Sequence, residues 1–147
     1  MRIFTAFLAL LLSAPAVAQA SAEMPVRQLR ISNHALSVEV AYTHATRSQG
    51  LMYRQSLGEN SGMLFVFPQP DRYSMWMMNT DIPLSVAFLD EGGAILNIAD
   101  MMPRTATAHR SAGASKYAIE MNRGWFAARN IKPGDRVTGL DKLPAAE

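Results

Sequence analysis

The 147-residue chain has 14 lysine and arginine residues, 12 aspartate and glutamate residues, three histidines and no cysteine. Without cysteine it has no disulfide, no thiolate-ligated metal centre and no thiol nucleophile. Hydrophobic residues make up 49% of it, as in folded proteins, and a formal charge of +2 without a basic run disfavours nucleic acid as a partner.

The first twenty residues have the layout of a secretory signal peptide. Arg2 precedes an apolar run from Ile3 to Leu12, and Ala18-Gln19-Ala20 forms a small-x-small cleavage site. A membrane-spanning helix needs about 20 apolar residues, twice the length of this run, so a retained anchor is the weaker alternative. We expect cleavage after Ala20, a periplasmic or secreted mature protein, and no stable membrane insertion.

Beyond residues 1–20, we expect a single globular domain over residues 21–147 with a core at about 26–142. Apolar and polar residues alternate in Leu36–Tyr42 and Tyr117–Asn122, which predicts two half-buried strands. The short apolar runs Gly62–Phe67 and Leu84–Leu89 predict two more. Glu91-Gly92-Gly93 is typical of a hairpin connection between Leu84–Asp90 and a strand over Ala94–Ala99.

Two segments favour helix. The first begins at the N-cap residue Thr43 and runs towards Tyr53, with Gly50 either ending it or permitting close backbone approach. The second is Arg123–Arg129, which Asn130 would terminate.

The C-terminal part begins with Lys132-Pro133-Gly134-Asp135, which predicts a type II turn before a closing strand over Arg136–Thr138. Leu143–Glu147 is expected to fray. Taken together, the elements predict an α+β, mostly β fold: a compact, barrel-like or strongly curved antiparallel or mixed sheet with two short helices.

Four blocks of sequence occur in a fixed order along the chain. They are Gly50-Leu51-Met52-Tyr53-Arg54, Gly62-Met63-Leu64-Phe65-Val66-Phe67, Met75-Trp76-Met77-Met78-Asn79-Thr80-Asp81-Ile82-Pro83-Leu84 and Ile131-Lys132-Pro133-Gly134-Asp135-Arg136-Val137. With these blocks the chain resembles domain-of-unknown-function family 192, small bacterial and archaeal proteins that often carry an export signal. The resemblance covers roughly Val38 to Val137. It implies a compact, mostly β fold and no established activity.

The chain departs from this family pattern at two positions. Met78 stands where the family usually has lysine, and Ser85 where it usually has aspartate. If the family's two residues form an ion pair, losing both together strands no charge. If they form a catalytic pair, this chain should be inactive.

The segment from Trp76 to Pro83 is the best candidate for a ligand-binding surface. Asn79 and Thr80 are polar residues between apolar strands, and loops on rigid scaffolds often carry binding groups. The alternative is that their side chains hydrogen-bond the turn before Pro83.

Three further residues are candidate ligand-binding groups. Arg54 can present a bidentate guanidinium to a carboxylate or phosphate, or pair with a local acid instead. Glu120 and Asn122 are expected on the polar face of their strand.

The favoured function is an exported, soluble, non-catalytic binding or accessory module of the envelope. Its partner would be an unknown small molecule or envelope component, and no cofactor is expected. One alternative is an envelope hydrolase that uses Glu120 or Asp81 as its acid–base group. The other is a Cu(I) carrier with thioether ligands from Met75, Met77 and Met78, against which methionine is also a flexible core residue.

Overall fold

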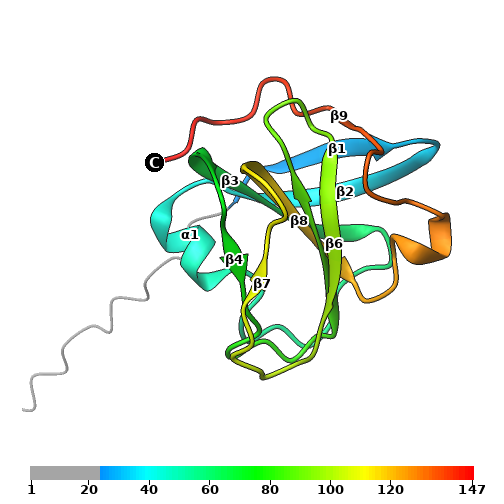
Figure 1. Ribbon diagram of the computed structural model, residues 1–147. Helices are drawn as coiled ribbons and strands as arrows, with labels where there is room; N and C mark the ends of the chain where they lie inside the picture. Colours follow the sequence, from blue (N-terminus) through cyan, green and yellow to red (C-terminus); the bar gives the residue numbers. More distant parts are fainter. Residues whose placement is uncertain (1–23) are drawn as a thin grey trace, which may run out of the picture.

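The computed structural model describes residues 24–147, so the predicted signal peptide and its cleavage site lie outside the described residues. Figure 1 shows a strongly curled sheet with helix α1 (His44–Gln49) beside it. The elements are β1 (Val26–Ile31), β2 (His34–Ala41), α1 (His44–Gln49), β3 (Ser61–Asp71), β4 (Ser74–Met75), β5 (Leu84–Leu89), β6 (Ile95–Met101), β7 (His109–Arg110), β8 (Ser115–Asn122), the 3-10 helix η1 (Ala127–Arg129) and β9 (Val137–Thr138). Among residues 24–147, no helix combines the length and the apolar character that crossing a membrane requires.

The main sheet has seven strands in the order β6-β5-β8-β3-β2-β1-β9, and β4 pairs with β7 in a second, two-stranded sheet. Strands β2 and β3 run parallel, whereas the other neighbours in the main sheet are antiparallel. Its two edges meet along a short seam, since Val137 N donates to Gly93 O at 2.8 Å and Ile95 N donates to Asp135 O at 2.9 Å. This curled mixed sheet confirms the predicted mostly β, strongly curved fold.

Each face of the curled sheet has its own hydrophobic core. The inner cluster takes residues from all seven strands and consists of Leu29, Ile31, Leu36, Val38, Val40, Leu64, Val66, Ala87, Leu89, Ile95, Ile119, Met121, Trp125, Phe126, Ile131 and Val137. The outer cluster consists of Ala41, Leu51, Met63, Phe65, Phe67, Met77, Ile82, Leu84, Val86, Phe88, Met101 and Ala118. Because strand side chains alternate between faces, the central strands β3, β5 and β8 contribute to both clusters.

Helix α1 begins where the sequence predicts and ends earlier. Thr43 caps it, because Thr46 N donates to Thr43 Oγ1 at 3.1 Å and Thr43 N donates to Thr46 Oγ1 at 3.0 Å, a reciprocal capping box. Gly50 ends it in the left-handed region, with φ +49. A Cβ at Gly50 would lie 3.3 Å from the Phe65 ring, so this glycine also permits a close approach to β3.

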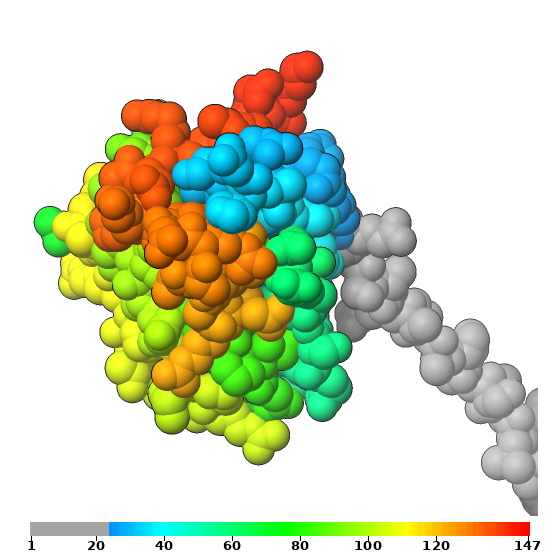
Figure 2. Space-filling view, turned by 90° about the vertical axis from the view of Figure 1, so that its right-hand side faces the viewer, coloured from blue at the N-terminus to red at the C-terminus, as the bar shows by residue number. Residues whose placement is uncertain are grey.

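The second predicted helix is wrong in length. Only the 3-10 helix η1 forms within Arg123–Arg129, and Asn130 ends it in the left-handed region as predicted. Trp125 and Phe126 hold this segment by packing into the inner cluster. In Figure 2 the orange segment lies against the blue β1–β2 hairpin.

Three other features differ from or confirm the expectations at the ends of the chain. Strand β1 has no predicted counterpart, and it pairs with β2 along its whole length. The predicted turn forms, since Asp135 N donates to Lys132 O at 3.1 Å and Gly134 has φ +96. The tail does not fray: Glu147 N donates to Tyr42 O at 2.8 Å, and Leu143 packs against the inner cluster.

Candidate functional site

A cavity of about 120 Å³ opens among α1, β4 and the loop that follows β4. Figure 1 shows α1 and β4 side by side at this place. Its apolar wall comprises Leu51, Met52, Phe65, Met75 and Trp76. The polar and charged side chains that line it come from α1, from Ser74 and Thr80, and from Glu120 on β8.

Glu120 is the buried acid of this cavity. Its side chain is only 4% exposed, and its neighbours on the adjacent strands are Met63 and Val86, both members of the outer cluster. Within residues 24–147 no donor hydrogen-bonds its carboxyl group, whose oxygens are open to the cavity. Burial raises the pKa of Glu120 to about 8, so the carboxyl is mostly protonated at neutral pH.

The prediction that Glu120 lies on a polar face of its strand is therefore wrong. The alternation in Tyr117–Asn122 is real, but β8 lies in the middle of the sheet with a hydrophobic cluster on each side. The side of β8 that carries Glu120 also carries Ala118 of the outer cluster. A single acidic residue in a strand that is buried on both faces was the signal for a special position.

Trp76 and Thr80, both predicted, line the same cavity as Glu120. Trp76 is 55% exposed, whereas Thr80 is buried. The Thr80 hydroxyl donates to Met78 O at 3.1 Å, and Thr80 N donates to Met77 O at 3.1 Å. Thr80 thus stabilises the turn and shapes the cavity wall at once.

Asn79 lies outside this cavity. It is exposed, has φ +54, and lines an open depression of about 390 Å³ together with Tyr53, Met78, Asp81 and Arg104. Its backbone O accepts from Tyr53 N at 2.9 Å, while its side chain makes no hydrogen bond to residues 24–147. The alternative in which the Asn79 side chain hydrogen-bonds the turn is therefore wrong. Asparagine suits this position because it tolerates a left-handed backbone.

Arg54 pairs with a local acid. Its guanidinium forms a bidentate ion pair with Glu39, in which Nη1 contacts Oε2 and Nη2 donates to Oε1 at 3.0 Å. Both side chains are about one-third exposed. Arg54 therefore has its alternative predicted role, pairing with a local acid. It lines neither the cavity nor the open depression.

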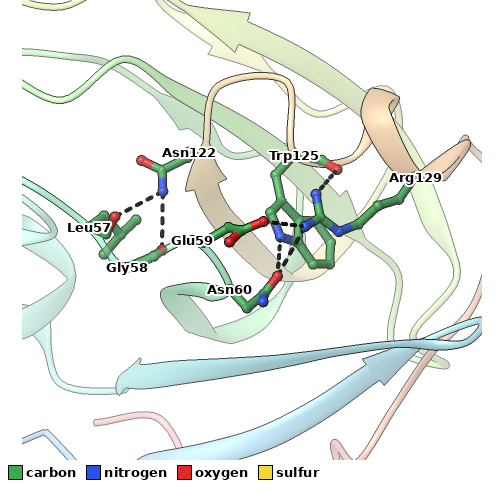
Figure 3. Close-up of polar contacts among 7 residues, drawn as sticks. All are labelled: Leu57, Gly58, Glu59, Asn60, Asn122, Trp125 and Arg129. Carbon is green, nitrogen blue, oxygen red and sulfur yellow. Dashed lines mark hydrogen bonds and ion pairs between the residues drawn. The ribbon is translucent and has the colours of Figure 1, made fainter.

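Asn122, the last residue of β8, is hydrogen-bonded to the loop before β3 (Figure 3). Its amide donates to Leu57 O at 3.0 Å and to Gly58 O at 3.1 Å. Beside it, Asn60 Oδ1 accepts from Trp125 Nε1 and from Arg129 Nη2, each at 3.1 Å. The Asn122 amide is occupied by the chain itself, which gives it a structural role.

The two candidate acids of the hydrolase alternative lie in different hollows. Asp81 lines the open depression and pairs with Arg104, whose Nε lies 2.6 Å from Asp81 Oδ1. Glu120 lines the cavity. They do not share a site.

The three methionines of the Cu(I) alternative lie in three surroundings. Met75 lines the cavity, Met77 is fully buried in the outer cluster, and Met78 lines the open depression at 36% exposure. A Cu(I) site needs thioethers that converge on one point. In the described part of the chain there is also no group of three or more histidine, aspartate or glutamate side chains placed to hold a metal ion.

Ser85 shows how this chain differs from the family pattern. Its hydroxyl donates to Asp100 Oδ1 at 2.6 Å and accepts from Gly124 N at 2.9 Å. Asp100 lies directly opposite Ser85 on β6. The carboxylate that is missing at position 85 is thus present on the neighbouring strand, whereas Met78 places no charge at its own position.

Comparison with known proteins gives a family and two similar structures. The family model of DUF192, described as Uncharacterized ACR, matches residues 27–139. A crystal structure described as a proposed transcription regulator from Sinorhizobium meliloti 1021 is 32% identical, with a TM-score of 0.79, over 82% of this chain and 98% of that chain. A protein of unknown function from Novosphingobium aromaticivorans DSM 12444 is 35% identical, with a TM-score of 0.76, over 86% of this chain and 93% of that chain. No curated protein matches the chain.

Proposed function

The chain belongs to the DUF192 family of uncharacterised proteins, and we propose that it is an exported, non-catalytic binding module of the cell envelope whose cavity beside Trp76 holds a small molecule. The proposal of export depends on the signal-peptide pattern of residues 1–20. The partner is a small envelope-borne compound, not nucleic acid.

The observation that carries the binding function is the buried Glu120 carboxyl at the cavity. Its strand position removes most of its hydration, while its oxygens, which accept no hydrogen bond from residues 24–147, are open to the cavity. A ligand in the cavity that donates to this carboxyl therefore gains a partner that the protein itself does not occupy. The cavity volume of about 120 Å³ is close to the roughly 150 Å³ of an engineered cavity that holds benzene. A ligand group of about five or six heavy atoms therefore fits.

The charges that line the cavity support binding over catalysis. Apart from Glu120, the charged residue in its lining is Arg47 of α1. The Arg47 guanidinium donates to three backbone oxygens, those of Tyr42 at 2.6 Å, Val66 at 3.1 Å and Glu147 at 2.8 Å. General acid–base hydrolysis normally uses two groups that exchange protons with the substrate, and here a single carboxyl is available for it.

One observation favours hydrolysis as a second candidate. A carboxyl group that stays protonated at neutral pH can act as a general acid, and the raised pKa of Glu120 meets that requirement. A bell-shaped pH–rate profile on any substrate, abolished by Glu120→Gln, would establish this alternative.

The charge balance gives no support to DNA binding by this chain. Proteins that bind DNA usually present a dense basic patch, whereas this chain has 14 basic against 12 acidic residues.

The test is an NMR screen of small fragments against the purified protein. The chain has two tryptophans, so Trp125, buried in the inner cluster, is an internal control for Trp76. We expect at least one fragment to shift the indole N–H signal of Trp76 saturably and to leave that of Trp125 in place. A fragment library that shifts neither signal, or both equally, would overturn the proposal.

A further inference from the structure

The acid at the cavity accepts no hydrogen bond from residues 24–147. An ionised carboxylate accepts hydrogen bonds at about four lone-pair sites and donates none. Within residues 24–147 no N–H or O–H group occupies these sites on Glu120, which is 4% exposed as a residue and has its oxygens open to the cavity. A positively charged group that is rich in donors is the natural partner of such a carboxylate.

The walls of the cavity suit the rest of such a ligand. Leu51 and Phe65 offer apolar surface to an alkyl chain, and Met75 adds a polarisable thioether. Trp76, which lines the cavity and is 55% exposed, adds an aromatic ring, the side chain that attracts cations most strongly.

Resting on the binding function proposed above, we propose that the ligand carries a primary alkylammonium group, which pairs with the carboxylate of Glu120 while its chain lies along the apolar wall. An ammonium group supplies three donors, more than a hydroxyl or an amide N–H. The volume of about 120 Å³ suits an aliphatic amine of about five heavy atoms.

The other charged group near the ligand is Arg47, from α1. The residues of β3, β4 and the loop after β4 that line the cavity with Glu120 are Phe65, Ser74, Met75, Trp76 and Thr80, none of which is charged. On the strands next to β8, Glu120 faces Met63 and Val86. Both Nη groups of Arg47 donate to backbone oxygens, and among residues 24–147 Arg47 forms no ion pair with Glu120.

This pairing couples ligand binding to proton release. Burial raises the pKa of Glu120 to about 8 in the free protein, so the carboxyl must lose its proton when an ammonium binds at pH 7. An alkylammonium with a pKa near 10.4 stays charged up to pH 9. We therefore expect release of close to one proton per amine at pH 7, and an affinity about tenfold higher at pH 9 than at pH 7.

The experiment compares three ligands of one shape by calorimetry: n-butylammonium, 1-butanol and butyrate. Titrations in buffers of different ionisation enthalpy at pH 7 and pH 9 count the protons released. We expect n-butylammonium to bind most tightly, to gain about tenfold in affinity at pH 9, and to shift the Trp76 indole signal. Nα-acetyl-lysine amide is the fourth ligand. If it binds as tightly as n-butylammonium, the ammonium comes from a lysine side chain, and if only the simple amine binds, it comes from a free amine.

Glu120→Gln keeps the shape of the side chain and removes its charge. Its affinity for n-butylammonium at pH 9 should therefore be at least about tenfold lower than that of the original protein. Glu91→Gln, at an exposed glutamate of the β5–β6 hairpin, is the matched control and should bind as the original protein does. An unchanged Trp125 indole signal shows that each variant is folded. If 1-butanol or butyrate shifts Trp76 and binds as tightly as the amine, the ammonium inference is wrong and the binding function stands. If none of the four ligands binds, the inference is wrong, and the binding function is then decided by the fragment screen alone.

Discussion

Trp76 and Glu120 line one cavity from opposite extremes of exposure: 55% of Trp76 is exposed, against 4% of Glu120. The ring comes from the loop after β4 and the carboxyl from the central strand β8. A ligand that reaches the carboxyl must therefore pass from solvent into a cavity lined by the outer cluster. This relationship connects the chemistry of the site to the stability of the fold, because the buried carboxyl affects both.

Glu120 should make the fold less stable as the pH rises. Its pKa is raised to about 8 in the folded protein, against 4.5 for an ordinary glutamate. The folded state therefore holds one more proton than the unfolded state between pH 4.5 and 8, and the free energy of unfolding falls across that window. The slope from this group reaches about 1.4 kcal/mol per pH unit. Urea denaturation at pH 5 to 9 measures it.

Glu120→Gln should remove this slope and unfold at higher urea concentration than the original protein at pH 8. Glu91→Gln, at an exposed position, is the control and should keep the slope. Parallel stability curves for the original protein and Glu120→Gln would contradict the assignment of a buried, protonated carboxyl.

Asn79 should affect stability through its backbone. At φ +54, glycine has no Cβ conflict and alanine does. We expect Asn79→Gly to be as stable as the original protein or more so, and Asn79→Ala to lose about 1 kcal/mol. Thermal melts of both variants decide this. The control is Asn33, an exposed asparagine without a positive φ, where alanine should change stability by less than about 0.5 kcal/mol. Equal loss with glycine and alanine at position 79 would show that the amide side chain matters instead.

Asn60 should matter through the indole of Trp125. Asn60→Ala removes the acceptor of the Trp125 N–H and of Arg129, so we expect a loss of about 1–2 kcal/mol. A double-mutant cycle with Trp125→Phe isolates the contact, since the cost of Asn60→Ala should shrink when the indole N–H is absent. Additive losses in chemical denaturation would argue that the contact contributes nothing.

The elements that form from local signals could be predicted from the sequence. Thr43 caps α1 in a capping box with Thr46, three residues further along the chain. Asn130 and Gly134 adopt the left-handed backbone that their turns require. Strand alternation indicated the curled sheet. It did not indicate that both faces of β8 are covered, because that depends on α1 and on the loop after β4, whose positions are fixed by tertiary packing.

Only part of the candidate site could be predicted, because tertiary packing also decides which polar side chains are occupied by the protein itself. Trp76 and Thr80, from the loop after β4, share the cavity with Glu120 of β8. Arg54 and Asn122 are held by Glu39 and by the carbonyl groups of Leu57 and Gly58. A single sequence does not show which distant group will occupy a polar side chain, so these two could not be separated from residues that are free to bind.

Export should leave a mature protein that begins at Ser21. The apolar run of Ile3–Leu12 and the cleavage site at Ala18–Ala20 motivate this expectation. Intact-mass measurement of the protein from separate cell fractions checks it. A full-length species confined to the cytoplasm would refute the envelope location, and it would leave the cavity and its ligand chemistry unaffected.

The most direct test of the account is the titration of the Glu120 side-chain carboxyl by ¹³C NMR, in the free protein and with saturating n-butylammonium. In the free protein we predict a pKa of about 8, because the carboxyl is buried beside the cavity without a donor. With the amine bound we predict a lower pKa, because the ammonium stabilises the ionised form. An ordinary pKa near 4.5 in the free protein, unchanged by the amine, would contradict the central claim that the buried Glu120 carboxyl binds the ammonium group of a ligand.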